Sequence, residues 1–142
     1  MSERRKIERI TISIPKELLK NIDDIINKKG YASRSDVIRS ALRGFLVEEA
    51  WKEEEEEEVI GVLTFIYDHE TKGVNESLTH IQHHFRGTVI SGMHIHLDEE
   101  NCLEVLVVKG KPEKIMKLTE KISTIKGVKY SDLTRAMSEK IG

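Results

Sequence analysis

Hydrophobic and polar residues alternate strictly near the start of the chain. Residues 9–14 read Arg-Ile-Thr-Ile-Ser-Ile, a pattern typical of a half-buried strand, because successive strand side chains point to opposite faces. The isoleucines share one face, and Arg9, Thr11 and Ser13 share the other. Pro15 follows and suits the first turn of a helix, where its missing N–H is harmless. The pattern therefore predicts a strand that leads directly into a helix.

Apolar residues then recur at helical spacing in two successive stretches, which predict two helices. Ser33 and Asp36 resemble a capping box at the start of the second helix, with Asp in place of the usual Glu. One strand and two helices are too few to bury their apolar face alone, so the strand needs a second copy as its partner. The helical positions are Leu18, Leu19, Ile22, Ile25 and Ile26 before Gly30, and then Val37, Ile38, Ala41, Leu42, Phe45 and Leu46.

The pattern changes after a run of six glutamates, Glu53–Glu58. Strand-like and helix-like stretches follow in the order βαββαβ, which is the ferredoxin-like arrangement. The sequence therefore predicts an α+β protein whose second part is a small ferredoxin-like domain. Its strands are expected at residues 59–67, 88–97, 102–108 and 128–133, and its helices at 73–86 and 112–126.

Charge divides the 142 residues into three parts. Residues 1–43 carry a net charge of +5, residues 44–59 carry −7, and residues 60–142 are neutral, which together give the −2 of the whole chain. A basic first part favours a polyanionic partner such as nucleic acid. The expected domains are a DNA-binding domain at 1–50, an acidic helix end and hinge at 51–58, and a second domain at 59–142.

Several features of the sequence bear on the cellular compartment of the protein. No apolar run approaches the roughly 18 residues of a transmembrane helix, and no apolar region follows the first charged residues as in a secretory signal. The only cysteine, Cys102, has no partner for an internal disulfide. We therefore expect a cytoplasmic protein with a reduced thiol and no membrane contact.

The histidines and the one thiol concentrate around a predicted hairpin. His94 and His96 are two residues apart on a strand and so share a face. If the hairpin loop is residues 98–100, His96 lies opposite Cys102 and His94 lies opposite Glu104. Two imidazoles, a thiol and a carboxylate then stand together. A slip of one residue would move Cys102 to the other face.

A stripe of histidines on the preceding helix offers a further ligand. His80, His83 and His84 occupy positions i, i+3 and i+4 of that helix. Three nitrogens and one thiolate suit a borderline transition metal, and a planar arrangement of them suits Ni(II) or Cu(II). Structural zinc favours more thiolates or a tetrahedral set. The residue chemistry alone predicts a thiolate–imidazole metal sensor and leaves the metal open.

Residues 8–47 resemble the ribbon-helix-helix repressors. The resemblance rests on the alternating strand, the proline after it, and Gly-Tyr-x-x-Arg-Ser-Asp-x-Ile-Arg at 30–39. It implies an obligate dimer whose paired strands enter the major groove of double-stranded DNA. The implied base contacts are Arg9, Thr11 and Ser13, and the implied phosphate contacts are Ser33, Arg34 and Ser35.

Nearly the whole chain resembles the nickel-responsive repressors of the NikR type, through Gln-His-His at 82–84, His-x-His at 94–96 and the cysteine six residues later. The resemblance implies an ACT-type domain, a homotetramer built as a dimer of dimers, and one square-planar Ni²⁺ per subunit. It also implies a palindromic operator and repression of nickel-uptake genes when nickel is bound. The implied ligands are His94, His96 and Cys102 of one subunit and His83 of a neighbour, with Glu104 behind them.

The resemblance leaves some residues without a role. These are the acidic run Glu53–Glu58, His80 and His84, and His69 is tied only loosely to secondary metal binding. Two other functions stay open: an ACT-domain regulator that senses a small metabolite such as an amino acid, and a metalloenzyme that uses the His/Cys cluster. Against an enzyme, Glu104 is the one clear general base near the ligands, and four protein ligands leave no in-plane position for water.

Overall fold

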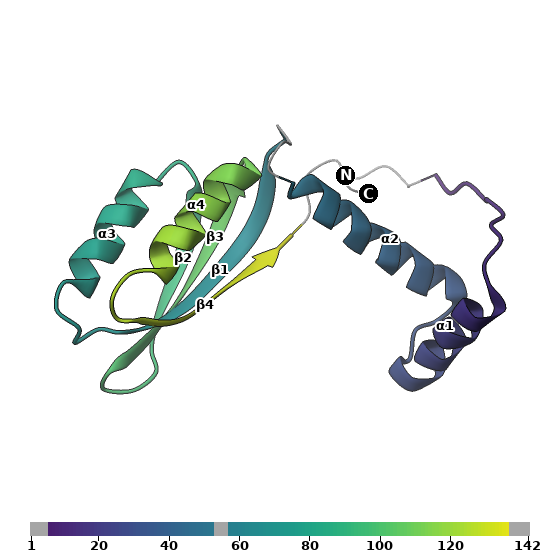
Figure 1. Ribbon diagram of the computed structural model, residues 1–142, viewed down its shortest axis with the longest axis horizontal. Coiled ribbons are helices and arrows are strands. Elements are labelled where there is room, and N and C mark those ends of the chain that lie inside the picture. The colour runs from purple at the N-terminus through teal and green to yellow at the C-terminus, as the bar shows by residue number, and fades with distance from the viewer. Residues whose placement is uncertain (1–5, 53–56, 137–142) are drawn as a thin grey trace. The chain divides into compact units, whose positions relative to one another are not determined.

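The computed structural model describes residues 6–52 and 57–136, which form two compact units that divide between Leu42 and Arg43. The division falls inside a helix, so one continuous helix contributes to both units. Figure 1 shows the elements in chain order: α1 (Lys16–Lys29), α2 (Arg34–Ala50), β1 (Val59–Asp68), α3 (Val74–His84), β2 (Val89–His96), β3 (Asn101–Gly110), α4 (Pro112–Ser123) and β4 (Val128–Arg135).

Both predicted helices of the first unit are confirmed. Helix α1 ends at Gly30, which adopts φ 76° and donates its N–H to the Ile26 carbonyl at 3.1 Å, as expected of a glycine that closes a helix. At the start of α2, the Ser33 hydroxyl accepts the Asp36 N–H at 3.2 Å. The predicted capping interaction is therefore present in one direction, while the Asp36 carboxylate pairs with Arg39 instead of reaching back.

The strand predicted at residues 9–14 is not formed in the single chain. Residues 6–15 have no regular structure, and Ile10 and Ile12 are 79% and 57% exposed. A strand needs hydrogen-bond partners along its edge, and within one chain this segment has none to pair with. Pairing of this segment with a second copy of the chain stays a prediction.

The second unit is the predicted βαββαβ domain. Its four strands form one antiparallel sheet in the order β2-β3-β1-β4, with β1 and β3 in the middle. Helices α3 and α4 cover one face of this sheet (Figure 1). The strand and helix ends lie close to those predicted. The largest differences are at the C-terminal ends: α3 ends two residues earlier, at His84, and α4 three residues earlier, at Ser123, whereas β3 and β4 each continue two residues further, to Gly110 and Arg135.

Alternation along the strands separates a buried face from an uncovered one. In β1 every second residue is buried beneath the helices, including Leu63, Phe65 and Tyr67. The buried residues of α4 pack onto them. The opposite face of the sheet carries apolar side chains as well, and Met93 and Tyr130 on it are 59% and 55% exposed. Among the described helices, none is long and apolar enough to cross a membrane.

Candidate metal centre

A tight loop sets the register of the hairpin between β2 and β3. The Asp98 carboxylate accepts the backbone N–H of Glu100 at 2.9 Å and that of Asn101 at 2.8 Å. The side-chain amide of Asn101 also donates to this carboxylate, and it is the main cause, ahead of the two backbone N–H groups, that the pKa of Asp98 is held below its usual value. Leu97 donates its N–H to the Asn101 carbonyl at 2.9 Å and closes the loop around 98–100. The predicted loop length is therefore confirmed.

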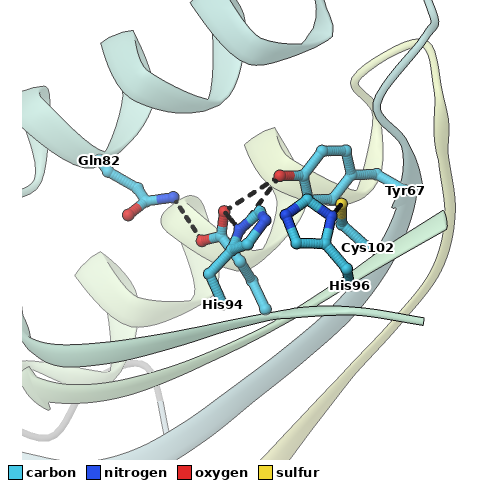
Figure 2. A network of polar contacts seen from close by, with 6 residues as sticks. Tyr67, Gln82, His94, His96 and Cys102 are labelled. Carbon is cyan, nitrogen blue, oxygen red and sulfur yellow. Dashed lines mark hydrogen bonds and ion pairs between the residues drawn. The ribbon is translucent and has the colours of Figure 1, made fainter. Parts of the chain in front are cut away.

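This register brings the predicted same-chain ligands together. His96 lies opposite Cys102 and His94 lies opposite Glu104, as expected from the loop. One ligand atom from each of His94, His96 and Cys102 lies within 4.8 Å of the others. The Cys102 sulfur is 3.4 Å from His96 Nδ1, and the two imidazole rings have centroids 5.1 Å apart. Figure 2 shows these side chains converging above the hairpin.

The cluster combines a buried thiol with two accessible imidazoles. Cys102 is fully buried, while His94 and His96 are exposed. Metal–ligand bonds of about 2.0–2.3 Å place two ligand atoms at most about 4.5 Å apart across one ion. The observed spacing therefore needs only small side-chain rotations to close around a single metal. The donor set of two nitrogens and one sulfur fits a borderline transition metal.

Behind His94, a carboxylate links the hairpin to α3. Glu104 Oε1 lies 3.4 Å from His94 Nδ1, and Gln82 donates its amide N–H to Glu104 Oε2 at 2.9 Å (Figure 2). The Tyr67 hydroxyl lies 3.5 Å from Glu104 Oε1 and 3.4 Å from His94 Nδ1. A carboxylate on one imidazole nitrogen fixes the ring and leaves the other nitrogen to face the cluster.

Tyr67 is neutral in this setting. It is 2% exposed, and burial raises its pKa well above the ordinary value, with further contributions from the negative charges of Glu104 and Cys102. Tyr67 lies directly opposite Cys102 across the β1–β3 pairing. Sequence reasoning did not give Tyr67 or Gln82 a role. The sequence signal for Gln82 is its spacing: it lies four residues after Leu78, which is buried on the side of α3 that packs on the sheet.

His83, the fourth predicted ligand, does not join the same-chain cluster. Within the described residues, the group that could hold a metal ion consists of His94, His96 and Cys102. His83 is exposed on α3 and lines a cavity of about 490 Å³ together with His94, Gln82 and Glu104. The cavity opens beside the cluster, so the region is accessible to a side chain from outside this chain.

The remaining histidines differ in their proximity to the cluster. His69 contacts the Glu99 carbonyl through Nε2, and its ring lies 6.1 Å from that of His96. His84 stacks edge-on against Phe85 at 5.1 Å, and His80 is exposed on α3. The acidic run Glu53–Glu58 lies partly outside the described residues.

The predicted DNA-contacting residues all lie in the first unit and are exposed. Arg9 and Thr11 belong to the extended segment before α1, and Ser33 caps α2. Arg34 forms a two-bond ion pair with Asp23, with both contacts at 2.9 Å. This pair raises the pKa of Arg34 and lowers that of Asp23, mainly through the side-chain hydrogen bonds. Ser13 and Ser35 complete the set, Ser13 before α1 and Ser35 in the first turn of α2.

Comparisons with known proteins agree with both halves of the chain. Residues 60–136 match the family described as the NikR C-terminal nickel-binding domain, and residues 8–49 match ribbon-helix-helix proteins of the CopG family. A provisionally assigned nickel-responsive regulator of Dictyoglomus thermophilum is 45% identical over 91% of this chain and 95% of its own length. A second such regulator, from Methanothermobacter thermautotrophicus, is 46% identical over 92% of this chain and 94% of its own.

A solved structure supports the fold of the second unit. An uncharacterised protein of Thermotoga maritima superposes with a TM-score of 0.53 and 20% identity, covering 57% of this chain and all of that one. The relatives and the two matched domains are those of a regulator and not of an enzyme. The chain therefore belongs to the nickel-responsive regulators of the NikR type, with a ribbon-helix-helix domain ahead of a domain of the NikR C-terminal nickel-binding family.

Proposed function

We propose that this protein is a nickel-dependent DNA-binding repressor that silences nickel-uptake genes when nickel is bound. The observation that carries the proposal is the convergence of His94, His96 and Cys102 on one face of a register-fixed hairpin. Membership in a family with a nickel-binding domain supplies the metal, and the ribbon-helix-helix domain supplies the DNA partner. In this proposal residues 1–50 contact DNA, residues 51–58 join the domains, and residues 59–142 hold the metal.

The proposed site holds one Ni²⁺ per subunit. Cys102 provides a thiolate from the buried face of β3, and the two imidazoles extend from the exposed edge strand β2. Glu104 holds His94 by its second nitrogen, and Gln82 and Tyr67 hold Glu104. A thiolate with imidazole nitrogens in a plane suits Ni(II). Ligand binding requires deprotonated Cys and neutral His, so nickel affinity should rise with pH.

The fourth ligand in this proposal is His83 of a neighbouring subunit. Within one chain His83 stays outside the ligand group, although it is exposed on the wall of the cavity beside His94. An accessible histidine near a cluster with three ligands is well suited to complete the site of another copy. The ion would then connect two subunits.

A homotetramer, arranged as a dimer of dimers, is supported by uncovered apolar surface in both units. In the first unit Ile10, Phe45 and Leu46 are 79%, 56% and 45% exposed. Pairing two copies would convert the segment at 9–14 into a ribbon and bury these side chains. In the second unit the uncovered face of the sheet carries exposed Met93 and Tyr130. Apolar surface of this kind marks contacts between proteins.

The proposed DNA contacts follow from the ribbon. Arg9, Thr11 and Ser13 of both chains would face the major groove, and the start of α2 with Ser33, Arg34 and Ser35 would approach phosphate. Arg34 is held by Asp23, which fixes its guanidinium beside the helix start. A tetramer carries two ribbons, so the operator should be a palindrome with two separated half-sites.

Selection of bound duplexes from a random DNA pool, with nickel present, tests the proposal. The recovered duplex should be palindromic, and its binding by the full-length protein should weaken strongly when nickel is removed by a chelator. Cys102→Ser and His83→Ala should each lose the nickel enhancement while keeping weak, salt-dependent binding. If no duplex is enriched, or if DNA binding is equally strong with and without nickel, the proposal is wrong. Titration with the common amino acids in place of nickel tests the metabolite-sensor alternative directly.

A further inference from the structure

The only tryptophan of the chain, Trp51, lies just beyond the end of α2 and is 5% exposed. No residue inside α2 itself is buried, yet Val47 and Ala50 in its last turn are partly buried against the same core as Trp51. That core belongs to the second unit, and the two units divide between Leu42 and Arg43. The end of α2 therefore packs with the metal-binding domain.

Trp51 is held by several contacts at one end of the sheet. A Cβ added at Gly61 would lie 2.9 Å from the indole ring, so the glycine provides the space that the ring occupies. The indole N–H donates to the Ala136 carbonyl at 3.1 Å, and the Ala136 N–H donates to the Ile60 carbonyl at 2.9 Å. The Arg135 guanidinium lies 5.9 Å from the ring centroid. We call this arrangement of Gly61, Arg135 and Ala136 the Trp51 seat.

One strand carries both this seat and a wall of the metal centre. Gly61 and Tyr67 belong to β1 and point to the same face of the sheet. They are six positions apart, or about 20 Å along a strand. At the far end, the Tyr67 hydroxyl contacts His94 and Glu104. The metal centre and the Trp51 seat therefore lie on one central strand, which is paired with a neighbour on each side.

We infer that Trp51 is a positioning residue that fastens the end of α2 to the regulatory sheet, so that bending between the domains occurs on its N-terminal side. The inference rests on the proposed function, in which nickel controls DNA binding. It shifts the expected hinge from residues 51–58 to the part of α2 before Trp51. Gly44 lies there, exposed and with no side chain to stiffen the helix.

The single tryptophan makes the inference directly measurable in the full-length protein. Indole emission reports the surroundings of Trp51 alone, because the chain contains no other tryptophan. The emission should be that of a buried indole, and it should stay unchanged when nickel, or nickel with the selected duplex, is added. A red shift on adding either would place the moving joint at Trp51 itself and overturn the inference.

Substitution at the seat tests its contribution to regulation. Gly61→Ala forces a methyl group against the indole, whereas Gly87→Ala is a matched control because nothing lies within 4 Å of its added Cβ. Gly61→Ala should red-shift the emission and speed amide exchange at Val47 and Ala50. It should leave nickel affinity, read from thiolate–nickel absorbance, at the wild-type value. The nickel enhancement of DNA binding should fall by about tenfold, within the usual range of coupling between sites.

A second variant keeps the test decisive if Gly61→Ala folds poorly. Trp51→Phe retains an apolar ring but removes the hydrogen bond to Ala136, and it should also weaken the nickel enhancement without weakening nickel binding. Full enhancement in both variants, with nickel bound, would overturn the inference. If wild type shows no nickel-dependent DNA binding, the proposed function fails. The emission and amide-exchange results still decide whether Trp51 fastens α2.

Discussion

Replacing Glu104 by glutamine should weaken nickel binding by a predictable amount. The Glu104 side chain is 14% exposed, and its two oxygens have different partners. Oε2 accepts the Gln82 amide at 2.9 Å, while Oε1 lies 3.4 Å from His94 Nδ1. The glutamine side chain has the same shape but only one accepting atom. If its NH₂ group points to His94 it faces the Nδ1–H donor, and if it points to Gln82 the Gln82 amide must turn over to accept through its oxygen; in both orientations the negative charge beside His94 is lost.

The expected loss follows from what the carboxylate does for its imidazole. A carboxylate on one ring nitrogen fixes the tautomer and raises the basicity of the ligating nitrogen, and loss of such a partner typically costs about 10–100-fold in metal affinity. That corresponds to about 1.4–2.8 kcal/mol, since each tenfold is about 1.4 kcal/mol. Gln82→Ala should cost less, because the carboxylate and its charge remain beside His94.

The nickel affinity of each variant is measured by competition with a chelator of known nickel affinity, with the thiolate–nickel absorbance as the signal. Glu113→Gln is the control, because Glu113 is exposed on α4 and pairs with a surface lysine, Lys117, at 3.2 Å. Glu113→Gln should bind nickel as wild type does. A nickel affinity for Glu104→Gln within twofold of wild type would refute the reasoning. The carboxylate would then neither orient the His94 ring nor raise the basicity of its ligating nitrogen.

Further predictions concern DNA binding, assembly and the hairpin. Arg9→Ala should keep nickel binding but lose about 1–3 kcal/mol of preference for the selected duplex over random DNA, as measured by competitive gel shift. A fragment of residues 59–142 should bind nickel as an oligomer without binding DNA, and sedimentation of a nickel-saturated monomer would contradict this. That fragment should melt at a lower temperature than residues 43–142, because it lacks the buried Trp51. Asp98 should stay ionised below pH 3.8 in an NMR carboxyl titration, and its contribution to hairpin stability should be lost only as pH falls through its lowered pKa.

The hairpin is the part of the site that sequence predicts best, for a simple geometric reason. Side chains on a strand alternate with a period of two, so a known loop length fixes which residues face each other. Asp98 identifies that loop, because a short carboxylate there accepts the following N–H groups. The opposition of His96 and Cys102 was predicted on the condition that the loop is residues 98–100, and it is confirmed.

Other features need information that local patterns do not contain. The neighbour of Cys102 on its other side is Tyr67, from a strand 35 residues earlier, and periodicity within each strand does not say which strands pair. In the sequence, Trp51 stands among the charged residues of a helix end and nothing next to it indicates burial. It is buried because it packs on Gly61 and donates to Ala136, which are distant in the sequence. The strand at 9–14 was predicted from its alternation and is not formed in the single chain, because alternation shows which side chains share a face but supplies no partner strand.

The distribution of ligands bears on how a metal could act as a signal. An ion shifts an equilibrium between two arrangements only by the difference in its affinity for them. His94, His96 and Cys102 come from one hairpin whose loop is closed by its own backbone, so these three proposed ligands would be the same in any arrangement of subunits. In the proposed site they would supply affinity but no preference between arrangements. Any preference must come from a group outside the hairpin.

His83 is such a group, because it lies on α3 and outside the same-chain cluster. In the proposed bridging role its bond to nickel forms only in an assembly that brings a neighbour's α3 to the hairpin. The strength of that one bond then sets how far nickel biases the assembly. Moving a population from 1:99 to 99:1 takes about 5.5 kcal/mol of differential binding. If one tetramer has four such sites, the bond from His83 to nickel at each site needs to contribute only about 1.4 kcal/mol to this total of differential binding. A weak fourth ligand is therefore sufficient for a strong response, provided the three hairpin ligands hold the ion in both arrangements.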